Sequence, residues 1–188
     1  MKVEPTDALI VVDVQNTFCP GGTLPVAEGD RVVEPLNRIM PLFRGRVYAS
    51  MDWHPADHVS FREQGGIWPP HAVAGTADAE LHSGLNRDGI ATVVRKGTAS
   101  ERDAYSAFDG TGLADTLRDA KVRRVFVGGL ATDYCVKATA LDARKAGFDV
   151  VLLTDASRAV DVAPGDGDRA VAEMREAGVE TAVTGDLS

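Results

Sequence analysis

The chain has 188 residues, of which 44% are hydrophobic and 26% are charged, and its formal net charge is −8. This length and composition predict a single globular domain over residues 1–188. The acidic balance, with no cluster of lysine or arginine, argues against nucleic acid or an anionic membrane surface as a partner.

The two cysteines, Cys19 and Cys135, form no CxxC pair and are too few for a disulfide framework. The N-terminal residues do not resemble a signal peptide. No segment approaches the ~20 apolar residues that a membrane span requires. We therefore expect a cytoplasmic protein, because a free thiol persists in a reducing compartment.

Short apolar runs alternate along the chain with segments of helical periodicity. The apolar runs are continuous, which is typical of strands covered on both faces. Strands are predicted over residues 8–12, 47–51, 91–94, 122–127, 150–153 and 181–183. Helices are predicted over residues 30–43, 113–120, 133–147 and 170–177. This order predicts a three-layer α/β fold with a mostly parallel six-stranded sheet and helices on both faces.

Local signals set several of the predicted boundaries. The fourth strand is expected to end in a tight turn at Gly128 and Gly129, after which Thr132 or Asp133 caps the next helix. The fifth strand is expected to end at Asp155. The last helix is expected to be capped by Asp168. Residues 53–85 form a long irregular segment rich in Gly, Pro and His, and such a segment in a compact domain is usually functional.

Polar residues follow four of the predicted strands, namely Asp13, Asp52, Lys96 and Cys135. The carboxyl ends of parallel strands share one edge of the sheet, so these side chains are expected to meet in one crevice. Taken singly, such an aspartate is more often a cap or turn residue, such a lysine is usually exposed, and most free cysteines are buried apolar residues. Their convergence favours a chemical role.

Cys135 is the candidate nucleophile. In the first turn of a helix, backbone N–H groups and the helix dipole favour a thiolate. Asp13 could take the thiol proton and return it to a leaving amine, while Lys96 would favour the thiolate and hold the aspartate in place. Backbone N–H groups of residues 129–132 could bind an oxyanion. This scheme needs no histidine base.

Asp52 and His54 are separated by one residue, and His71 lies in the long irregular segment. Two imidazoles and a carboxylate with open coordination positions suit Zn²⁺, Fe²⁺ or Mn²⁺. This spacing is less specific than that of an HExxH motif, and hydrogen bonds that stabilise the loop are the alternative interpretation. Further ligands could come from water or from Ser60, His58 or Glu63.

Together these motifs resemble those of nicotinamidases in the isochorismatase-like superfamily of cysteine hydrolases. The resemblance covers residues 8–183 and is carried by VVDVQNTFCPGG, MDWHPADHVSF, WPPHAVAGT, RKGTASERDAYSAFDG and GGLATDYCVKATALDA. It implies a fold of Rossmann-like topology and a catalytic triad consisting of Asp13, Lys96 and Cys135. It also implies a divalent metal, zinc before iron or manganese, held by Asp52, His54 and His71.

The resemblance extends to the substrate pocket. It implies a cis peptide bond between Leu130 and Ala131, and an oxyanion hole formed by the N–H groups of Ala131 and Cys135. The walls of the pocket are expected to be Phe18, Trp68, Tyr105 and Leu130. Ala72 is a departure, because many relatives have cysteine at that position.

The resemblance implies hydrolysis of nicotinamide to nicotinate and ammonia through a thioester on Cys135, a reaction of NAD salvage. It also implies a homo-oligomeric protein. Activity on related pyridine carboxamides, such as pyrazinamide, stays open. Two alternatives remain. One is another hydrolase of the superfamily, acting on a non-pyridine amide or on isochorismate. The other is a catalytically silent binding protein on the same fold, since fold does not fix function.

Overall fold

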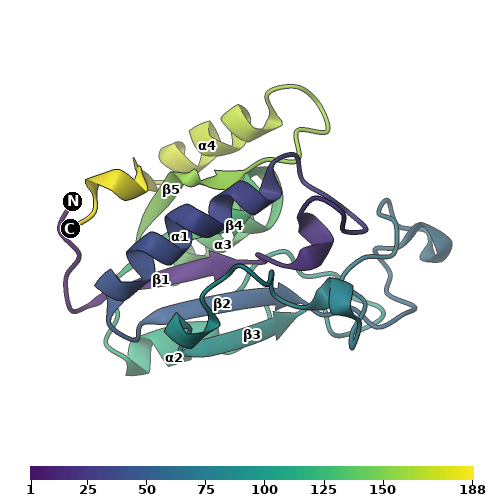
Figure 1. Cartoon of the computed structure of the whole chain (residues 1–188), viewed down its shortest axis with the longest axis horizontal. Helices are drawn as coiled ribbons and strands as arrows, with labels where there is room; N and C mark the ends of the chain where they lie inside the picture. Colours follow the sequence, from purple (N-terminus) through teal and green to yellow (C-terminus); the bar gives the residue numbers. More distant parts are fainter.

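The computed structural model describes residues 1–188, which are arranged around one six-stranded sheet (Figure 1). The strands lie in the order β3-β2-β1-β4-β5-β6, and every neighbouring pair is parallel. The strand order changes direction between β1 and β4, and open α/β sheets bind their ligands beyond the carboxyl ends of such strands. The predicted α/β fold is confirmed.

The strands are β1 (Asp7–Val12), β2 (Val47–Asp52), β3 (Thr92–Lys96), β4 (Arg124–Leu130), β5 (Asp149–Arg158) and β6 (Glu180–Ala182). The helices are α1 (Val33–Ile39), α2 (Leu113–Asp119), α3 (Lys137–Lys145) and α4 (Asp166–Glu176). Short 3₁₀ turns extend α1 at both ends. In Figure 1, α1 lies in front of the sheet and α3 behind it. None of the helices has the length and apolar character needed to cross a membrane.

The apolar run of β1 does not alternate with polar residues because the strand is buried on both faces. Leu9 and Val11 belong to the core on the α1 face, whereas Ala8, Ile10 and Val12 belong to the core on the α3 face. All five side chains are inaccessible to solvent. Because successive residues of a strand point to opposite faces, a sheet covered on both sides requires apolar residues at every position.

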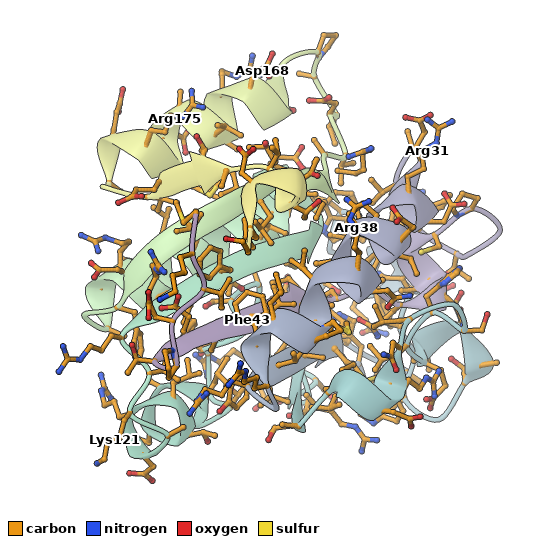
Figure 2. All side chains as sticks on the ribbon, turned by 60° about the vertical axis from the view of Figure 1, so that its left-hand side comes forward. Arg31, Arg38, Phe43, Lys121, Asp168 and Arg175 are labelled. Carbon is orange, nitrogen blue, oxygen red and sulfur yellow. The ribbon has the colours of Figure 1, made fainter.

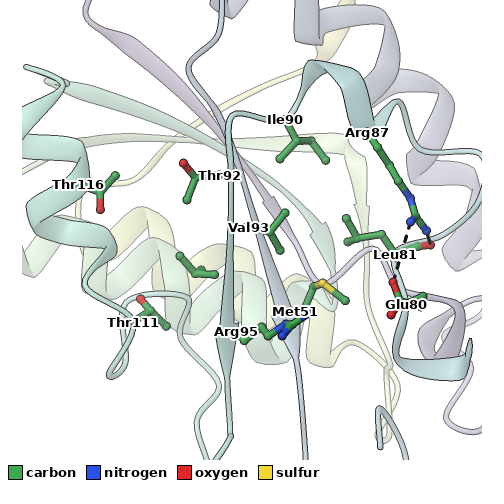
Figure 3. Close-up of a pocket in the computed structure, with 11 residues that line it drawn as sticks. Met51, Glu80, Leu81, Arg87, Ile90, Thr92, Val93, Arg95, Thr111 and Thr116 are labelled. Atoms are coloured by element: carbon green, nitrogen blue, oxygen red, sulfur yellow. Dashed lines mark hydrogen bonds and ion pairs between the residues drawn. The ribbon is translucent and has the colours of Figure 1, made fainter. Parts of the chain in front are cut away.

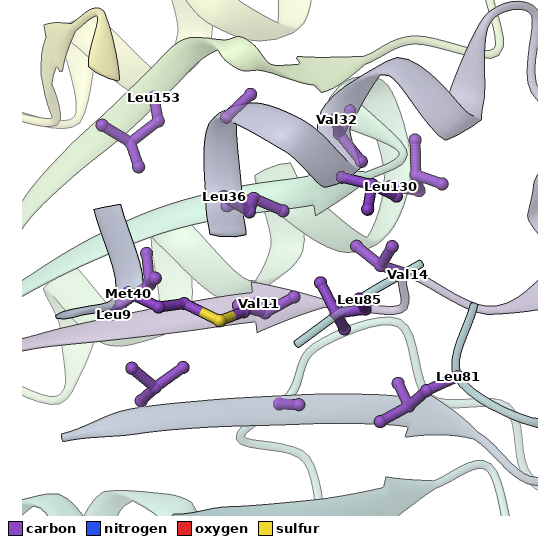
Figure 4. Close-up of a cluster of buried hydrophobic side chains, with 14 of the residues drawn as sticks. Leu9, Val11, Val14, Val32, Leu36, Met40, Leu81, Leu85, Leu130 and Leu153 are labelled. Atoms are coloured by element: carbon purple, nitrogen blue, oxygen red, sulfur yellow. The ribbon is translucent and has the colours of Figure 1, made fainter. Parts of the chain in front are cut away.

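The core on the α1 face also contains part of the long segment between β2 and β3 (Figure 4). Leu36 of α1 packs with Leu9 and Val11 of β1, and Leu81 and Leu85 of the long segment join the same cluster. These contacts bury two leucines of a segment that has little regular secondary structure. The segment is therefore anchored to the core, and its histidines are carried by an ordered scaffold.

Many charged side chains lie at the periphery of the molecule (Figure 2). Arg31, Lys121, Asp168 and Arg175 are all exposed there. Asp168 lies on the exposed face of α4, which begins earlier, directly after Gly165. The prediction that Asp168 caps this helix is therefore wrong, because a glycine in the left-handed conformation starts the helix instead.

Two strands extend beyond their predicted ends. β4 continues to Leu130, so Gly128 and Gly129 lie inside the strand, and the predicted turn at this point is wrong. β5 continues past Asp155 to Arg158 and pairs with β4 again after a shift in register. Glycine and aspartate signal turns in isolation. Pairing with β1 outweighs that local preference at Gly128 and Gly129, whereas Asp155 lies in the irregular part of β5 before pairing with β4 resumes at Ser157.

Gly129 is required by the close approach of β4 to β1. Its φ is +124°, and a Cβ at this position would lie 2.1 Å from the carbonyl oxygen and 2.8 Å from the amide nitrogen of Val12. Both atoms belong to backbone, which cannot rotate away as a side chain would. Glycine therefore lets the two strands run together up to the residue before Asp13.

Replacing Gly129 by alanine is expected to lower the free energy of unfolding by more than about 2 kcal/mol, because the new methyl group would overlap with buried backbone. Gly147→Ala is the matched control. Gly147 also has a positive φ, +92°, but no atom lies within 4 Å of the added methyl group. Backbone strain alone should cost this control about 1 kcal/mol. Urea unfolding measures both, and equal losses would contradict the steric explanation.

Candidate active site

The side chains predicted at the strand ends meet around the ammonium group of Lys96. Its Nζ lies 2.5 Å from Oδ1 of Asp52, 2.9 Å from Oδ2 of Asp13 and 3.4 Å from Sγ of Cys135. It also donates a hydrogen bond to the carbonyl oxygen of Ala104 at 3.1 Å. All four clustered side chains are buried. The structure thus brings together all four side chains that were expected to meet at this edge: Asp13, Asp52, Lys96 and Cys135.

The sheet itself determines this convergence. Asp13 directly follows β1, while Asp52 and Lys96 are the last residues of β2 and β3. Asp52 and Lys96 are paired in register on neighbouring parallel strands, so their side chains point to the same face. Asp13 has a φ of +49°, which turns the chain out of the sheet at this point.

The charges on the cluster follow from burial and ion pairing. Burial alone would lower the pKa of Lys96, but the carboxylates of Asp13 and Asp52 raise it well above its ordinary value. Burial alone would raise the pKa of Asp52, but Lys96 and His54 bring it below its ordinary value. Lys96 is therefore an ammonium and Asp52 a carboxylate at neutral pH.

Burial raises the pKa of the Cys135 thiol well above its ordinary value, and the attraction of Lys96 offsets this only in part. Lys96 thus favours the thiolate, as expected, whereas burial and, to a smaller extent, Asp13 and Asp52 favour the thiol. Burial also raises the pKa of Asp13. A carboxylate with a raised pKa is a better proton acceptor, so Asp13 is suited to take the proton when the sulfur reacts.

Cys135 lies in a π-helical turn, Thr132–Val136, that connects β4 to α3. The N–H of Val136 donates to the carbonyl oxygen of Ala131 at 3.0 Å, across five residues. Neither predicted cap is used. The carboxylate of Asp133 instead accepts two backbone N–H groups of the loop after β5, each at 2.9 Å. Thr132 pairs with a serine of β5. Such wide turns are frequent at functional sites.

The peptide bond between Leu130 and Ala131 is cis, as the resemblance implies. The N–H of Ala131 donates to no acceptor within the protein, so it is available to a ligand. Ala131 and Cys135 both line the same pocket. This placement is compatible with an oxyanion hole at these two residues.

Asp52, His54 and His71 form a second cluster, in which one ligand atom of each residue lies within 4.8 Å of the others. Nδ1 of His54 lies 2.9 Å from the carbonyl oxygen of Gly97, and Nδ1 of His71 lies 2.8 Å from that of Pro69. A carbonyl oxygen can only accept, so each Nδ1 carries a proton, and in the neutral imidazole each Nε2 then keeps a free lone pair. Metal-binding histidines are oriented in this way.

The charges of the site also fit a bound cation. Asp13 and Asp52 outnumber the single ammonium of Lys96, which leaves excess negative charge in a buried place. Burial lowers the pKa of His71, so its imidazole is neutral and able to bind a metal. Burial would also lower the pKa of His54, but Asp52 raises it overall, because positive charge is favoured between these two residues. The residues present therefore fit a divalent metal.

The further ligands considered from the sequence have different surroundings. Nδ1 of His58 lies 2.7 Å from Oγ of Ser60, and its Nε2 lies 3.1 Å from the carbonyl oxygen of Arg102. The ring of His58 stacks on His54, with 3.9 Å between the ring centroids. Glu63 is exposed. In this arrangement the ring of His58 packs against His54, and Ser60 holds the ring of His58.

An apolar pocket opens beside Cys135, and the four predicted wall residues Phe18, Trp68, Tyr105 and Leu130 all line it. The indole N–H of Trp68 donates to the Tyr105 hydroxyl at 3.2 Å. The sequence motifs did not point to Tyr134, whose ring centroid lies 5.2 Å from that of Trp68. The pocket is narrow: its cavity volume is about 50 Å³, well below that of most ligand pockets.

A second hollow lies along β3 and is lined by residues that include Glu80, Arg87 and Thr92 (Figure 3). Glu80 and Arg87 face each other there, with 4.0 Å between their charged atoms. None of the residues around Lys96 or of the histidine cluster lines this hollow. The pocket beside Cys135 is therefore the candidate substrate site.

Two buried polar side chains support the site without having been singled out from the sequence. The amide of Gln15 donates to the carbonyl oxygen of Asp52 at 2.8 Å and accepts from its N–H at 2.8 Å. The hydroxyl of Ser50 donates to Oδ1 of Asp13 at 2.6 Å. Gln15 lies two positions after Asp13, and Ser50 lies two positions before Asp52. Because alternate residues of a strand share one face, the second spacing could have revealed Ser50 from the sequence.

Comparison with known proteins agrees with this geometry. Residues 7–186 match the family model described as an isochorismatase domain, and the chain belongs to this family. Within it, the chain is similar to nicotinamidases: that of Escherichia coli strain K12 is 42% identical, over 93% of each chain. The predicted superfamily is therefore confirmed.

Two solved structures share the fold over almost their whole length. Pyrazinamidase of Pyrococcus horikoshii in complex with zinc has a TM-score of 0.88 and 46% identity, covering 95% of this chain and 99% of its own. PnC1 from L. infantum in complex with nicotinate has a TM-score of 0.95 and 43% identity, covering 100% of this chain and 98% of its own.

Replacing Lys96 by methionine is expected to lower the free energy of unfolding at pH 7 by about 3–5 kcal/mol, because two buried carboxylates lose their counter-ion. Without the ammonium, burial raises the pKa of both carboxylates above their unfolded values. Protonation at lower pH then favours the folded state, so the deficit should be smaller at pH 5 than at pH 7. Urea unfolding at the two pH values measures this.

Lys137→Met is the control, because the Lys137 ammonium pairs with Glu173 at 3.0 Å on the surface of the molecule. Loss of such a pair should cost less than about 1 kcal/mol. If the Lys96 variant were as stable as this control, the ammonium of Lys96 would not be the counter-ion of the buried site.

Proposed function

We propose that the protein hydrolyses nicotinamide to nicotinate and ammonia. The observation that carries the proposal is that the cluster around Lys96 and the histidine cluster around Asp52 adjoin one small apolar pocket. Similarity to nicotinamidases over nearly the whole chain supports it. Further support comes from the solved relative that holds nicotinate, the expected product.

Cys135 is the proposed nucleophile. Its sulfur attacks the carboxamide carbon while its proton passes to the carboxylate of Asp13. Lys96 keeps its own proton and contacts both the sulfur and the carboxylate, so it stabilises negative charge as it moves between them. The carboxamide oxygen becomes negative in the tetrahedral intermediate, and we assign its binding to the N–H groups of Ala131 and Cys135.

Asp13 then acts in the opposite direction. It gives the proton to the leaving nitrogen, ammonia departs, and a thioester remains on Cys135. A water molecule next loses a proton to Asp13 and adds to the thioester carbon. Cleavage of the carbon–sulfur bond releases nicotinic acid, which loses a proton to solvent to give nicotinate, and the proton on Asp13 returns to the sulfur. One carboxylate thus serves both half-reactions, and no histidine base is needed.

Asp52, His54 and His71 are proposed to hold a divalent metal, with zinc as the first candidate and iron or manganese as alternatives. The zinc complex of the Pyrococcus relative supports this choice. When bound, the metal supplies a Lewis-acid contact, which the family resemblance assigns to the pyridine nitrogen. The aromatic walls, among them Phe18 and Trp68, would hold the ring between this contact and Cys135.

Cys135→Ala is expected to release no measurable ammonia from nicotinamide, because the thioester cannot form. Cys19→Ala is the control, since Cys19 is the other buried cysteine and does not line the pocket. It should keep activity within about two-fold, by analogy with tolerated small changes of volume. Ammonia release over time measures both variants, and mass spectrometry of quenched wild-type protein should detect the acylated cysteine. An active Cys135→Ala protein would exclude the mechanism.

His71→Ala is expected to lose bound metal after dialysis, because one of three protein ligands is removed. His82→Ala is the control: the Nδ1 of His82 accepts from the N–H of Gly84, outside the histidine cluster. Metal content by atomic spectroscopy should be about one ion per chain in the wild type and the control. Equal content in all three proteins would place the metal elsewhere.

A further inference from the structure

We propose that Ser50 is a positioning residue for the proton transfer, acting through Asp13. The inference rests on the proposed function and deepens it. The Ser50 hydroxyl donates to Oδ1 of Asp13 at 2.6 Å, and this is the one hydrogen bond that the carboxylate accepts. Its other oxygen, Oδ2, lies 2.9 Å from Nζ of Lys96 as an ion pair.

The two oxygens of Asp13 therefore have different tasks. Oδ2 is buried and accepts no hydrogen bond from the protein, although it faces the Lys96 ammonium. An oxygen of this carboxylate lies within 4.8 Å of the Cys135 sulfur. Oδ2 is then the oxygen open to the thiol proton, and Oδ1 is the one held from the opposite side by a donor.

Ser50 holds Asp13 in two ways. Its backbone carbonyl accepts the N–H of Asp13 at 3.1 Å, and its hydroxyl binds the carboxylate of the same residue. Ser50 is inaccessible to solvent, so bulk water does not compete with its hydroxyl for the carboxylate. Asp13 lies just beyond β1 with a positive φ, where strand pairing no longer orients its side chain.

The hydroxyl comes from the strand that also carries Asp52. Ser50 and Asp52 are separated by one residue of β2 and point to the same face. One strand thus supplies both the donor for Asp13 and the second carboxylate for Lys96. During acylation the carbon–sulfur bond forms and the thiol proton moves to Oδ2, while Ser50 retains its own proton. Ser50 is for this reason not a catalytic acid or base.

Three substitutions separate hydrogen bonding from packing. In Ser50→Ala, kcat for nicotinamide should fall roughly 10- to 100-fold, part of the 10²–10⁴ that a positioned base supplies, with KM within about two-fold. Ser50→Cys fills nearly the same volume but is a weak donor, so kcat should fall there too. Ser50→Thr keeps the hydroxyl and should stay within about five-fold of the wild type.

Thr184→Val is the matched control for stability. The Thr184 hydroxyl is buried and donates to Oδ2 of Asp155 at 2.6 Å, the same kind and length of bond, but neither residue lines the pocket. It should lose thermal stability as Ser50→Ala does, yet keep the wild-type kcat. The metal content of each variant is measured alongside, so that an effect through Asp52 is distinguished from one through Asp13.

The inference is overturned if Ser50→Cys keeps the wild-type kcat, if the loss in Ser50→Ala lies only in KM, or if it follows lost metal. It is also overturned if Thr184→Val loses as much kcat as Ser50→Ala. A wild-type protein that releases no ammonia from nicotinamide overturns the proposed function, and the inference with it. An active wild type with unaffected Ser50 variants overturns the inference alone.

Discussion

The buried ammonium of Lys96 is the interaction on which the rest of the site depends. An ammonium without access to water is tolerated only when its charge is compensated nearby, and here Asp13 and Asp52 provide that compensation from the ends of two other strands. The same contacts determine the protonation of their neighbours. Burial, together with the two carboxylates, raises the pKa of the Cys135 thiol, and Asp52 favours positive charge on His54.

Backbone geometry supplies what electrostatics cannot, which is the position of the sulfur. β4 runs against β1 up to the end of both strands because Gly129 has no side chain. A cis peptide bond and a single π turn follow, and they bring Cys135 back over the end of β1. The N–H of Ala131 is left free in the same turn. Nucleophile and amide donor are therefore set by one short stretch of backbone.

Several features of the site could be anticipated because a parallel sheet has simple rules. Continuous apolar runs indicate strands covered on both faces, and the carboxyl ends of those strands lie at one edge. Asp13, Asp52 and Lys96 could thus be placed together without any knowledge of their distances. The wrong predictions concern local signals. Gly128 and Asp155 were expected to end strands, but β1 pairs with β4 through Gly128, and β5 pairs with β4 again at Ser157 after an irregularity that contains Asp155.

Residue type and order are enough to place a cysteine, a lysine and two aspartates at one edge of an α/β sheet, because strand direction and side-chain alternation are properties of the chain itself. Only the tertiary structure determines whether each of these side chains is protonated or charged. The pKa of Cys135 depends on burial and on charged residues that are distant in sequence, and a helix start by itself reveals neither. The hydroxyl of Ser50 likewise gains its role only because β2 lies beside β1.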